Sequence, residues 1–297
     1  MKTEPARDFV LCVDKPVGPT SHDVVAHARR ALGTRRIGHT GTLDPFASGL
    51  LLLCVNRATR IAEYLTGLDK SYMAVARLDT FTETDDRTGA VVETFDSWRT
   101  LQQPALETAL TELAARTEQV PSVYSAKKLG GERAYRLARA GTAVQLAPVN
   151  IRVHTLRLTR FDPPDVELEV VCSSGTYVRA LARDLGILLG TGGHLTALRR
   201  TRIGHFGIEG AVALHQIADP ASRATAAHDL ADALRHLPSI TVSDEEALQL
   251  ARGQRIPARP DSRPGEVTLA LRDHRVFAVV RRDGDWLRPH KVLALPE

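Results

Sequence analysis

The sequence predicts an α+β protein in which a large domain is followed by a small β-rich domain. Short apolar runs, such as residues 9–13 and 50–55, are typical of buried strands, and the spacing of leucines predicts an amphipathic helix at 104–116. After residue 237 the pattern changes to short apolar runs separated by Pro, Gly and Asp, which is typical of a small β module. We therefore expect domains at 1–237 and 238–297.

The composition is that of a globular protein with an ordinary core. The chain has 297 residues, 43 % of them hydrophobic. No apolar run approaches the ~20 residues that span a bilayer, and residues 1–8 are polar, so we expect neither a membrane anchor nor a signal peptide and place the protein in the cytoplasm. Cys12, Cys54 and Cys172 lie far apart in apolar stretches, which favours buried reduced thiols over disulfides or a zinc site.

The excess of positive charge is concentrated near the C-terminus. The chain carries 39 Lys and Arg against 35 Asp and Glu, a net charge of +4. Residues 250–297 alone contain ten basic and six acidic side chains. This distribution indicates either a polyanionic partner such as nucleic acid or a solvated basic face.

A candidate catalytic carboxylate lies in residues 38–49, Gly-His-Thr-Gly-Thr-Leu-Asp-Pro-Phe-Ala-Ser-Gly, which have neither a helical nor a strand period. Their glycines permit backbone conformations that other residues avoid, and Pro45 biases Asp44 toward an extended conformation. Such a loop presents the Asp44 carboxylate in a fixed direction. Taken alone, a loop of this composition is more often a surface turn with a capping aspartate.

Neighbouring segments predict the elements around this loop. Thr20 or Ser21 is placed to cap the helix that follows, with Asp23 in its first turn. The acidic segment 79–96 predicts strand ends and a turn rather than a metal site, because its carboxylates lack a fixed ligand spacing. The further elements expected are a helix at 58–65, a strand from 70 and a hairpin formed by 149–161 and 166–172.

The order of residues in the Asp44 loop closely resembles the catalytic loop of the TruB-type tRNA pseudouridine-55 synthases. Asp14 to Ser21 also matches a family motif, Asp-Lys-Pro-x-Gly-x-x-Ser, and the similarity covers nearly the whole chain. The resemblance implies a pseudouridine-synthase catalytic domain, with a mixed, mainly antiparallel sheet flanked by helices, followed by a PUA-like RNA-binding domain. Two positions depart from the family: Asn56 stands in a turn that is usually Gly-Glu, and Ser174 replaces a lysine that contacts phosphate.

The resemblance implies one essential carboxylate, at Asp44, and a set of residues around it. Arg179, in Gly-Thr-Tyr-x-Arg, is implied to pair with this carboxylate, and Tyr72 to stack on the target base and take part in proton transfer. His39 is implied to lie against the RNA where the target base has left its stack. The other implied substrate-binding residues are Tyr177, Leu198, Lys15, Lys127 and Arg199.

A second RNA-binding feature is expected at 119–147. This stretch combines basic side chains with Tyr124, Tyr135 and two adjacent glycines, which suits a lobe that closes over an RNA loop. An exposed helix with a basic face would have a similar sequence. The stretch also resembles the thumb of the family, which grips the T-arm of tRNA.

The sequence thus predicts an enzyme that isomerises one uridine in the T-loop of tRNA to pseudouridine. The reaction has no redox or phosphoryl-transfer step, so we expect no cofactor and no metal. The expected partner is the T-arm stem-loop, and we expect a monomer without an obligate protein partner. Three alternatives stay open: a non-catalytic tRNA-binding or folding protein, a related synthase that acts on another RNA, and a nucleotide-phosphate enzyme. The last is disfavoured because the loop lacks a Gly-Lys-Ser/Thr ending.

Overall fold

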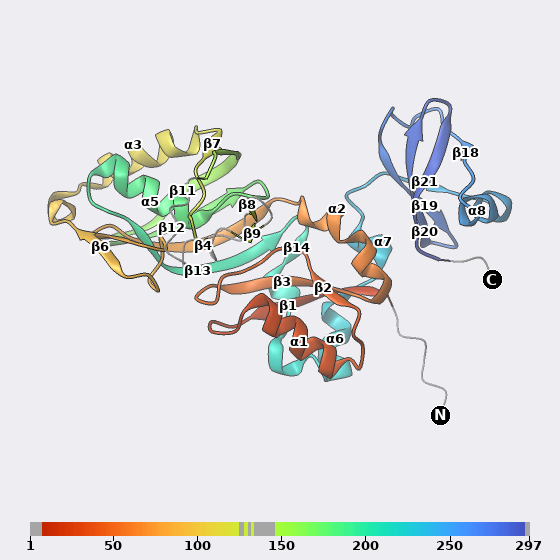
Figure 1. The fold of residues 1–297 in the computed structure, drawn as a ribbon, viewed down its shortest axis with the longest axis horizontal. Coiled ribbons are helices and arrows are strands. Elements are labelled where there is room, and N and C mark those ends of the chain that lie inside the picture. Colours follow the sequence, from red (N-terminus) through yellow and green to blue (C-terminus); the bar gives the residue numbers. More distant parts are fainter. Residues whose placement is uncertain (1–7, 125–127, 130–131, 134–145, 295–297) are drawn as a thin grey trace.

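The computed structural model describes residues 8–124, 128–129, 132–133 and 146–294. A ten-stranded sheet and a separate five-stranded sheet dominate it. Figure 1 shows the large sheet on the left and in the centre and the small sheet, formed by the C-terminal residues, at the right.

The main path of the large sheet has the strand order β11-β12-β4-β13-β3-β1-β15. Neighbouring strands on this path are antiparallel except for two parallel pairs, β13 with β3 and β1 with β15. The expected α+β fold with a mixed, mainly antiparallel sheet is therefore confirmed. The strands are β11 (Val153–Asp162), β12 (Asp165–Cys172), β4 (Lys70–Arg77), β13 (His194–Ile203), β3 (Ser48–Val55), β1 (Phe9–Lys15) and β15 (Val212–Ala213), with β2 (Ile37–His39), β14 (Phe206–Gly207) and β16 (Ala227–His228) paired to β3, β13 and β1.

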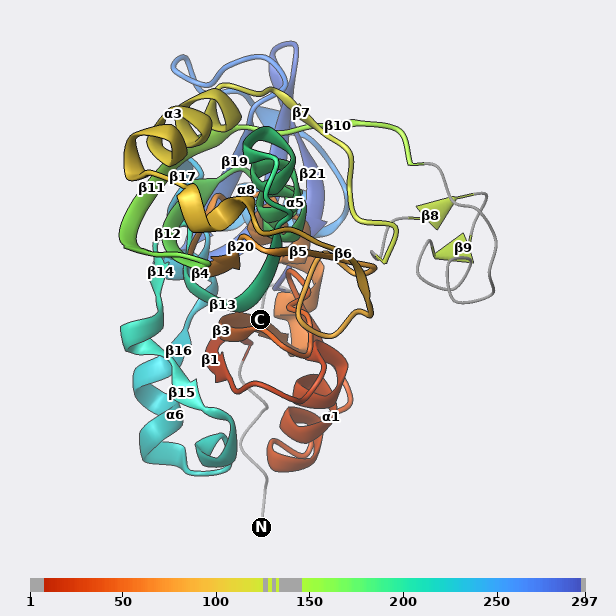
Figure 2. The same cartoon turned by 90° about the vertical axis from the view of Figure 1, so that its left-hand side faces the viewer.

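Two apolar cores cover different halves of this sheet. Helices α3 (Gln103–Ala114) and α5 (Val178–Leu189) pack on β4, β12 and β13, and the views from two sides place both helices on one face (Figures 1 and 2). The other core surrounds β1 and β3 and includes α1 (Ser21–Ala31), α6 (Pro220–Ala226) and α7 (Leu230–Ala233). Strands β1 and β3 are almost entirely buried, which explains their continuous apolar runs.

The first helix begins as its sequence predicts. Thr20 is the N-cap: its hydroxyl accepts a hydrogen bond from the Asp23 amide at 3.1 Å, and the Asp23 carboxylate accepts one from the Thr20 amide at 2.9 Å. This reciprocal capping box satisfies two amides that have no partner inside the helix. Ser21, the other candidate cap, is buried and uses its hydroxyl elsewhere.

The C-terminal module has the expected β-rich character. Its sheet has the order β17-β19-β20-β21-β18, and its own core includes Val242, Phe277 and Leu287. On the other side of the module, Val276 and Val279 pack into the core of the large sheet. The elements are β17 (Ser239–Thr241), α8 (Asp244–Ala251), β18 (Ile256–Pro257), β19 (Val267–Arg272), β20 (Arg275–Asp283) and β21 (Trp286–Val292).

Three local expectations differ from the structure. The segment expected as a helix at 58–65 is a 3-10 helix, η1 (Asn56–Ile61), followed by the short α2 (Ala62–Thr66); Asn56 has φ +56°, so the chain enters η1 through a left-handed residue. The strand expected at 149–161 is interrupted, because β10 (Val149–Asn150) pairs with β7 (Glu118–Gln119) and not with the large sheet. Helix α8 was not expected.

The remaining elements are short and mostly lie at the edges of the large domain. They are β5 (Thr80–Thr82), β6 (Val91–Thr94), η2 (Ser97–Thr100), β8 (Lys128–Leu129), β9 (Glu132–Arg133), η3 (Ile208–Gly210) and η4 (Leu214–Gln216). In Figure 2, β8 and β9 stand to one side of the sheet. Strands β5 and β6 form a hairpin within 79–96, where strand ends and a turn were expected.

Gly49, at the end of the Asp44 loop, lies where β3 meets β13 in the large sheet. It pairs with Arg200 in the parallel contact of β3 with β13, and it has φ +105°. A Cβ atom at this position would lie 2.2 Å from the Arg200 carbonyl oxygen. Glycine is required here for two reasons, the backbone conformation and the close approach of β13.

We expect Gly49→Ala to lower the free energy of unfolding by more than about 3 kcal/mol, because backbone strain and overpacking each cost about 1–3 kcal/mol. Gly33→Ala is the matched control: Gly33 also has a positive φ, +62°, but a Cβ there meets no atom within 4 Å, so we expect a loss of about 1 kcal/mol. Urea unfolding of both variants measures the difference. Equal losses would mean that the approach of β13 imposes no constraint.

Candidate active site

The Asp44 loop is held in place by burial of its apolar residues and by hydrogen bonds to the segment at Gly18 and Ser21. Its apolar residues Leu43, Phe46 and Ala47 are buried in the core beneath α3 and α5. The Ser21 hydroxyl accepts from the Leu43 amide at 2.9 Å and donates to the Leu43 carbonyl at 3.1 Å, and the Pro45 carbonyl accepts from the Gly18 amide at 2.8 Å. The loop is therefore held in place by its buried residues Leu43, Phe46 and Ala47 and by these hydrogen bonds, while Pro45 is exposed.

Asp44 forms a two-point ion pair with Arg179 at the start of α5. The Arg179 Nε atom lies 3.0 Å from Asp44 Oδ2, and Nη2 lies 3.4 Å from Oδ1. The Arg179 side chain is 8 % exposed, whereas that of Asp44 is 35 % exposed. The structure thus brings together the two residues expected to pair, with the cation buried and the carboxylate open to a ligand.

Asp86 completes the surroundings of this arginine and was not among the residues singled out in the sequence. Its Oδ2 atom lies 3.3 Å from Arg179 Nη1, and the side chain is only 5 % exposed. The other carboxylate oxygen, Oδ1, accepts one hydrogen bond from the Thr84 hydroxyl and one from the Thr88 hydroxyl. Arg179 also donates to the backbone carbonyls of Thr84 at 2.8 Å and Tyr124 at 3.1 Å.

The sequence does hold a signal for this second carboxylate. Arg179 and Arg183 are four residues apart on a helix that is otherwise apolar on the same side, and neighbouring residues Asp86 and Asp85 pair with them, Arg183 with Asp85 at 3.3 Å. Two arginines on one buried helix face require two acidic partners. Without the topology, any of several carboxylates in the acidic segment 79–96 could have supplied them.

The electrostatic environment of Asp44 contains opposing influences. Burial raises the pKa of the Asp44 carboxyl above its ordinary value; Arg179 and Lys15 lower it, and the negative charge of Asp86 raises it. Arg179 is therefore the chief group that opposes the rise of the Asp44 pKa caused by burial. An ionised carboxylate that is half-desolvated and held in one orientation is suited to act as a base or a nucleophile.

Tyr72 lies on β4 in the same core and next to a buried arginine. Its side chain is 7 % exposed, and burial raises the pKa of the phenol, while a hydrogen bond and the charge of Arg200 lower it. Arg200 is itself 1 % exposed; it donates to the carbonyls of Leu50 at 2.7 Å and Gly41 at 3.0 Å. One guanidinium thus links Tyr72 to the catalytic loop.

Arg200 was missed because the sequence has two adjacent arginines in one strand. Consecutive side chains of a strand point to opposite faces. Arg199 takes the exposed face, where its guanidinium pairs with Asp14 at 2.7 Å, and Arg200 takes the buried one. Arg199 was the residue selected for substrate contact, and its 44 % exposed side chain remains accessible for one.

His39 lies at the end of β2, just before the loop. Its Nδ1 atom accepts a hydrogen bond from the Gly41 amide at 3.3 Å, and its ring meets that of His22 edge to face with centroids 5.4 Å apart. Burial, together with His22 and Arg200, lowers the pKa of His39. The imidazole is consequently neutral near pH 7.

Lys15 has a structural position in this site. The residue is completely buried, and its Nζ atom donates to the carbonyls of Pro16 at 2.9 Å and Pro19 at 2.8 Å. Burial lowers the pKa of Lys15 to about 8, although Asp44 opposes that change. Lys15 therefore shapes the segment that holds the Asp44 loop and offers no exposed surface to the RNA it was expected to contact.

Of the other residues predicted to bind substrate, Tyr177 lies at the start of α5 and Leu198 lies in the core. Tyr177 is the N-cap residue of α5, and the Gln119 side-chain amide bonds both its backbone groups, at 2.9 and 3.1 Å. Leu198 on β13 is 8 % exposed and belongs to the same core as Tyr72. Lys127 lies outside the described residues, as does most of the expected thumb.

The described residues contain no group of three His, Cys, Asp or Glu side chains placed to hold a metal ion. The described helices include none that is long and apolar enough to cross a membrane. The three cysteines are buried free thiols, as expected, and burial raises the pKa of each.

Comparison with known proteins gives consistent matches. A model of the N-terminal domain of TruB family pseudouridylate synthases matches residues 29–178, and a model of the tRNA pseudouridylate synthase B C-terminal domain matches residues 179–239. The chain is 54 % identical over 214 residues to tRNA pseudouridine synthase B of Mycobacterium avium, covering 71 % of this chain and 69 % of that one. With its Thermobifida fusca counterpart it is 43 % identical over 295 residues, covering 97 % and 99 %.

A solved structure shares the fold at lower sequence identity. The archaeal box H/ACA sRNP Nop10-Cbf5 complex contains a chain that superposes with a TM-score of 0.74 at 24 % identity, covering 99 % of this chain and 90 % of that chain. At this identity the likeness supports the fold and no more than the fold.

We expect Arg179→Met to raise the pKa of the Asp44 carboxyl, because it removes the chief positive charge and leaves Asp86 in place. The acid form of Asp44 then persists to a higher pH than in the unsubstituted protein. Carbon-13 NMR of labelled aspartate carboxyls measures the titration directly. Arg183→Met is the control, since Arg183 pairs with Asp85 and Asp184 and not with Asp44. An Asp44 titration that moves equally in both variants would contradict the assigned pairing.

Proposed function

The chain belongs to the TruB family of pseudouridylate synthases and isomerises uridine in tRNA to pseudouridine, and on that premise we propose that Asp44 is the carboxylate on which the chemistry depends. The single observation that carries the proposal is the ion pair in which a partly exposed carboxylate is held at two points by a buried arginine. We further propose that the target is the uridine at position 55 of the T-loop.

The reaction breaks the N1–C1′ bond, joins C5 to C1′ and releases the C5 proton. It therefore needs a base or nucleophile near the sugar, walls that hold the free uracil while it turns, and a group that collects the proton. Asp44 supplies the first, and Leu198 and Tyr72 supply apolar and aromatic walls. Asp44 suits this role because its side chain is partly exposed while Arg179 holds both of its carboxylate oxygens in one orientation.

Tyr72 is the group we assign to the C5 proton. Burial raises the pKa of the phenol, so its hydroxyl is protonated near pH 7. The phenol oxygen takes up the C5 proton as its own O–H proton passes to solvent water, which leaves Tyr72 neutral again. The guanidinium of Arg200 stabilises negative charge that develops on the phenol oxygen. Arg200 also donates a hydrogen bond to the Gly41 carbonyl of the Asp44 loop. The position of this loop and the environment of the Tyr72 phenol therefore depend on the same guanidinium.

The target uridine must leave the T-loop stack to reach Asp44, which costs a few kcal/mol. Contacts elsewhere with the RNA offset this cost. We propose that the thumb segment at 119–147 and a PUA-like domain at 238–297 provide them, and that the protein acts as a monomer. The support for the second is the five-stranded module together with the ten basic residues of the tail.

A non-catalytic tRNA-binding protein was one alternative that the sequence alone left open. It would need the basic tail but no paired carboxylate, and the burial of Arg179 between Asp44 and Asp86 argues against it. Tritium release from C5-labelled uridine in an unmodified tRNA transcript tests the two functions against each other.

We expect Asp44→Asn to lower the single-turnover rate of isomerisation by more than about a hundredfold, because it removes the charge that acts at the sugar while the side chain keeps its shape. Affinity for tRNA should change little, since Asp44 is one small contact of many. Tritium release gives the rate and filter binding gives the affinity. A variant that retained more than a few per cent of the rate would sink the assignment.

We expect His39→Phe to retain much more activity than His39→Ala. The neutral imidazole is proposed to fill the gap left by the flipped uridine, and that role needs a flat ring rather than a titrating one. The defect of the Ala variant should shrink on RNA whose target base is already unstacked. Equal and complete loss in both variants, on folded tRNA and on a flexible stem-loop, would instead assign the imidazole a chemical step.

A further inference from the structure

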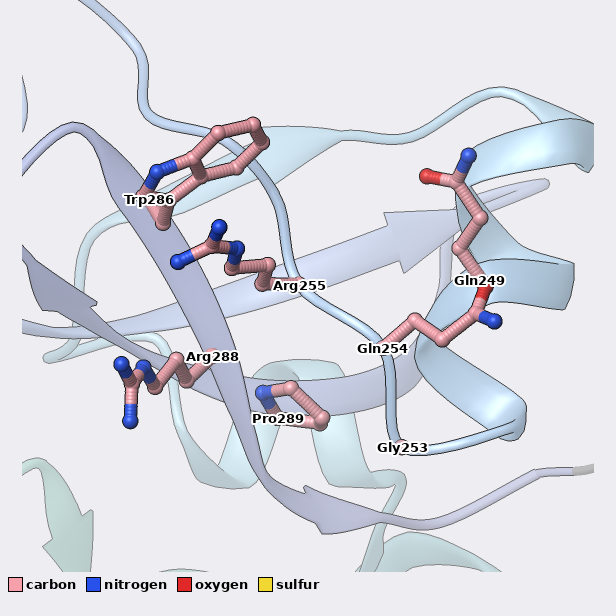
Figure 3. A pocket seen from close by; sticks show the side chains of 7 residues that line it. All are labelled: Gln249, Gly253, Gln254, Arg255, Trp286, Arg288 and Pro289. Atoms are coloured by element: carbon pink, nitrogen blue, oxygen red, sulfur yellow. The ribbon is translucent and has the colours of Figure 1, made fainter.

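The C-terminal module carries an open hollow that has no part in the site around Asp44. Its volume is about 650 Å³, within the ~300–1,000 Å³ range of small-molecule sites. Figure 3 shows the side chains around it, which come from the end of α8, the following loop and β21. The lining residues are Gln249, Gly253, Gln254, Arg255, Trp286, Arg288 and Pro289.

The centre of the hollow is an arginine stacked on a tryptophan. The guanidinium carbon of Arg255 lies 4.2 Å from the centroid of the Trp286 ring, and in Figure 3 it sits between that ring and the rest of the hollow. The tryptophan is 36 % exposed, which is high for so large an apolar residue. The indole restrains the guanidinium through a cation–π contact.

Arg255 differs from the other arginines nearby in its charge balance. Within the described part of the chain no carboxylate lies within 4.0 Å of its guanidinium, whereas Arg288 pairs with Asp283 at 2.8 Å. The comparable stack of Arg99 on Trp98, elsewhere in the chain, has its charge compensated by Asp96 at 3.0 Å. The stack at Trp286 thus presents an uncompensated, flat cation to solvent.

These groups match the chemistry of a nucleotide. Bases stack on aromatic rings and on guanidinium planes, and their edges take hydrogen bonds from amides such as those of Gln249 and Gln254. Arg288, at the rim, is placed for a phosphate. An acidic peptide would use the cations but would leave the stacking surface and the amides without a purpose.

A second hollow continues the first toward the large domain. The two share Gly253 and Pro289, and the second is also lined by Arg57, Arg60 and His290. Arg57 and Arg60 donate to the carbonyls of Leu293 and Val292, so their positions are fixed where the module meets η1. A row of cations leading away from a stacking surface is the pattern of a groove that follows a single strand.

We propose that the hollow at Trp286 binds an unpaired nucleotide of the tRNA that lies outside the T-arm. The inference rests on the proposed function in taking tRNA as the bound RNA. The location follows from the fold: α5, which carries Arg179, and β21, which carries Trp286, lie toward opposite ends of the long axis in Figure 1. RNA whose T-loop reaches Asp44 therefore meets the hollow with another part.

Tryptophan fluorescence tests the stacking directly, because the chain has only two tryptophans. In the Trp98→Phe protein, Trp286 is the sole reporter. We expect quenching on titration with full-length tRNA transcript and none with the isolated T-arm stem-loop.

Affinity measurements provide the second readout. We expect Trp286→Leu to weaken binding of full-length tRNA by about 5- to 150-fold, the range for loss of one stacked base, and to leave stem-loop binding unchanged. Arg255→Gln should weaken it too, and Trp286→Phe should retain most of it. Trp98→Leu removes the compensated stack and is the matched control, with no expected effect.

Three results would overturn the proposal. The first is full-length tRNA that neither quenches Trp286 nor binds more weakly to Trp286→Leu. The second is equal quenching by the T-arm stem-loop, which would place the hollow on the T-arm. The third is quenching by polyglutamate with none by tRNA. Tritium release measured in the same samples reports the isomerisation separately, so a failure of the proposed function is distinguished from a failure of this site.

Discussion

The structure depends on one buried guanidinium. Arg179 is 8 % exposed and contacts two carboxylates and two backbone carbonyls. A buried charge is tolerated only where such partners surround it, and removal of one partner of a buried pair typically costs 3–5 kcal/mol. The contacts of Arg179 therefore hold the Asp44 loop, the hairpin around Asp86 and the backbone at Tyr124 in one arrangement. Tyr124 lies in the segment proposed as the thumb. Arg179 therefore contacts both the catalytic carboxylate and the segment proposed to bind RNA.

The site balances two requirements that oppose each other. Reaction at a sugar is favoured by a dry, rigid carboxylate, but drying a carboxylate raises its pKa and removes its charge. Two cations lower the pKa of Asp44 and so oppose the effect of burial: Arg179 in direct contact and Lys15 farther away. Lys15 is itself buried, and burial lowers its pKa to about 8. The stability of the loop and the charge of Asp44 are thus set by the same few side chains.

Features that depend on a few consecutive residues were predictable from the sequence, and those that depend on topology were not. The capping box at Thr20, the shaped loop around Asp44 and the β-rich module follow from local patterns. The partnership of Arg179 with Asp86 requires knowing that the hairpin after β4 reaches α5, and the burial of Arg200 requires the parallel contact of β13 with β3. Helix α8 was missed although its sequence carries a local signal, the capping box formed by Ser243 and Glu246.

The contacts that hold the Asp44 loop also fix the order in which the protein matures. Arg179 and the Gly41 contact of Arg200 join residues 135 and 159 positions apart in the chain. During synthesis the loop emerges early and waits while more than half of the polypeptide is made. A nascent or truncated chain that ends before α5 lacks both arginine contacts and the strand that Gly49 meets. The contacts around Asp44 are therefore complete only when the chain has been made through β13.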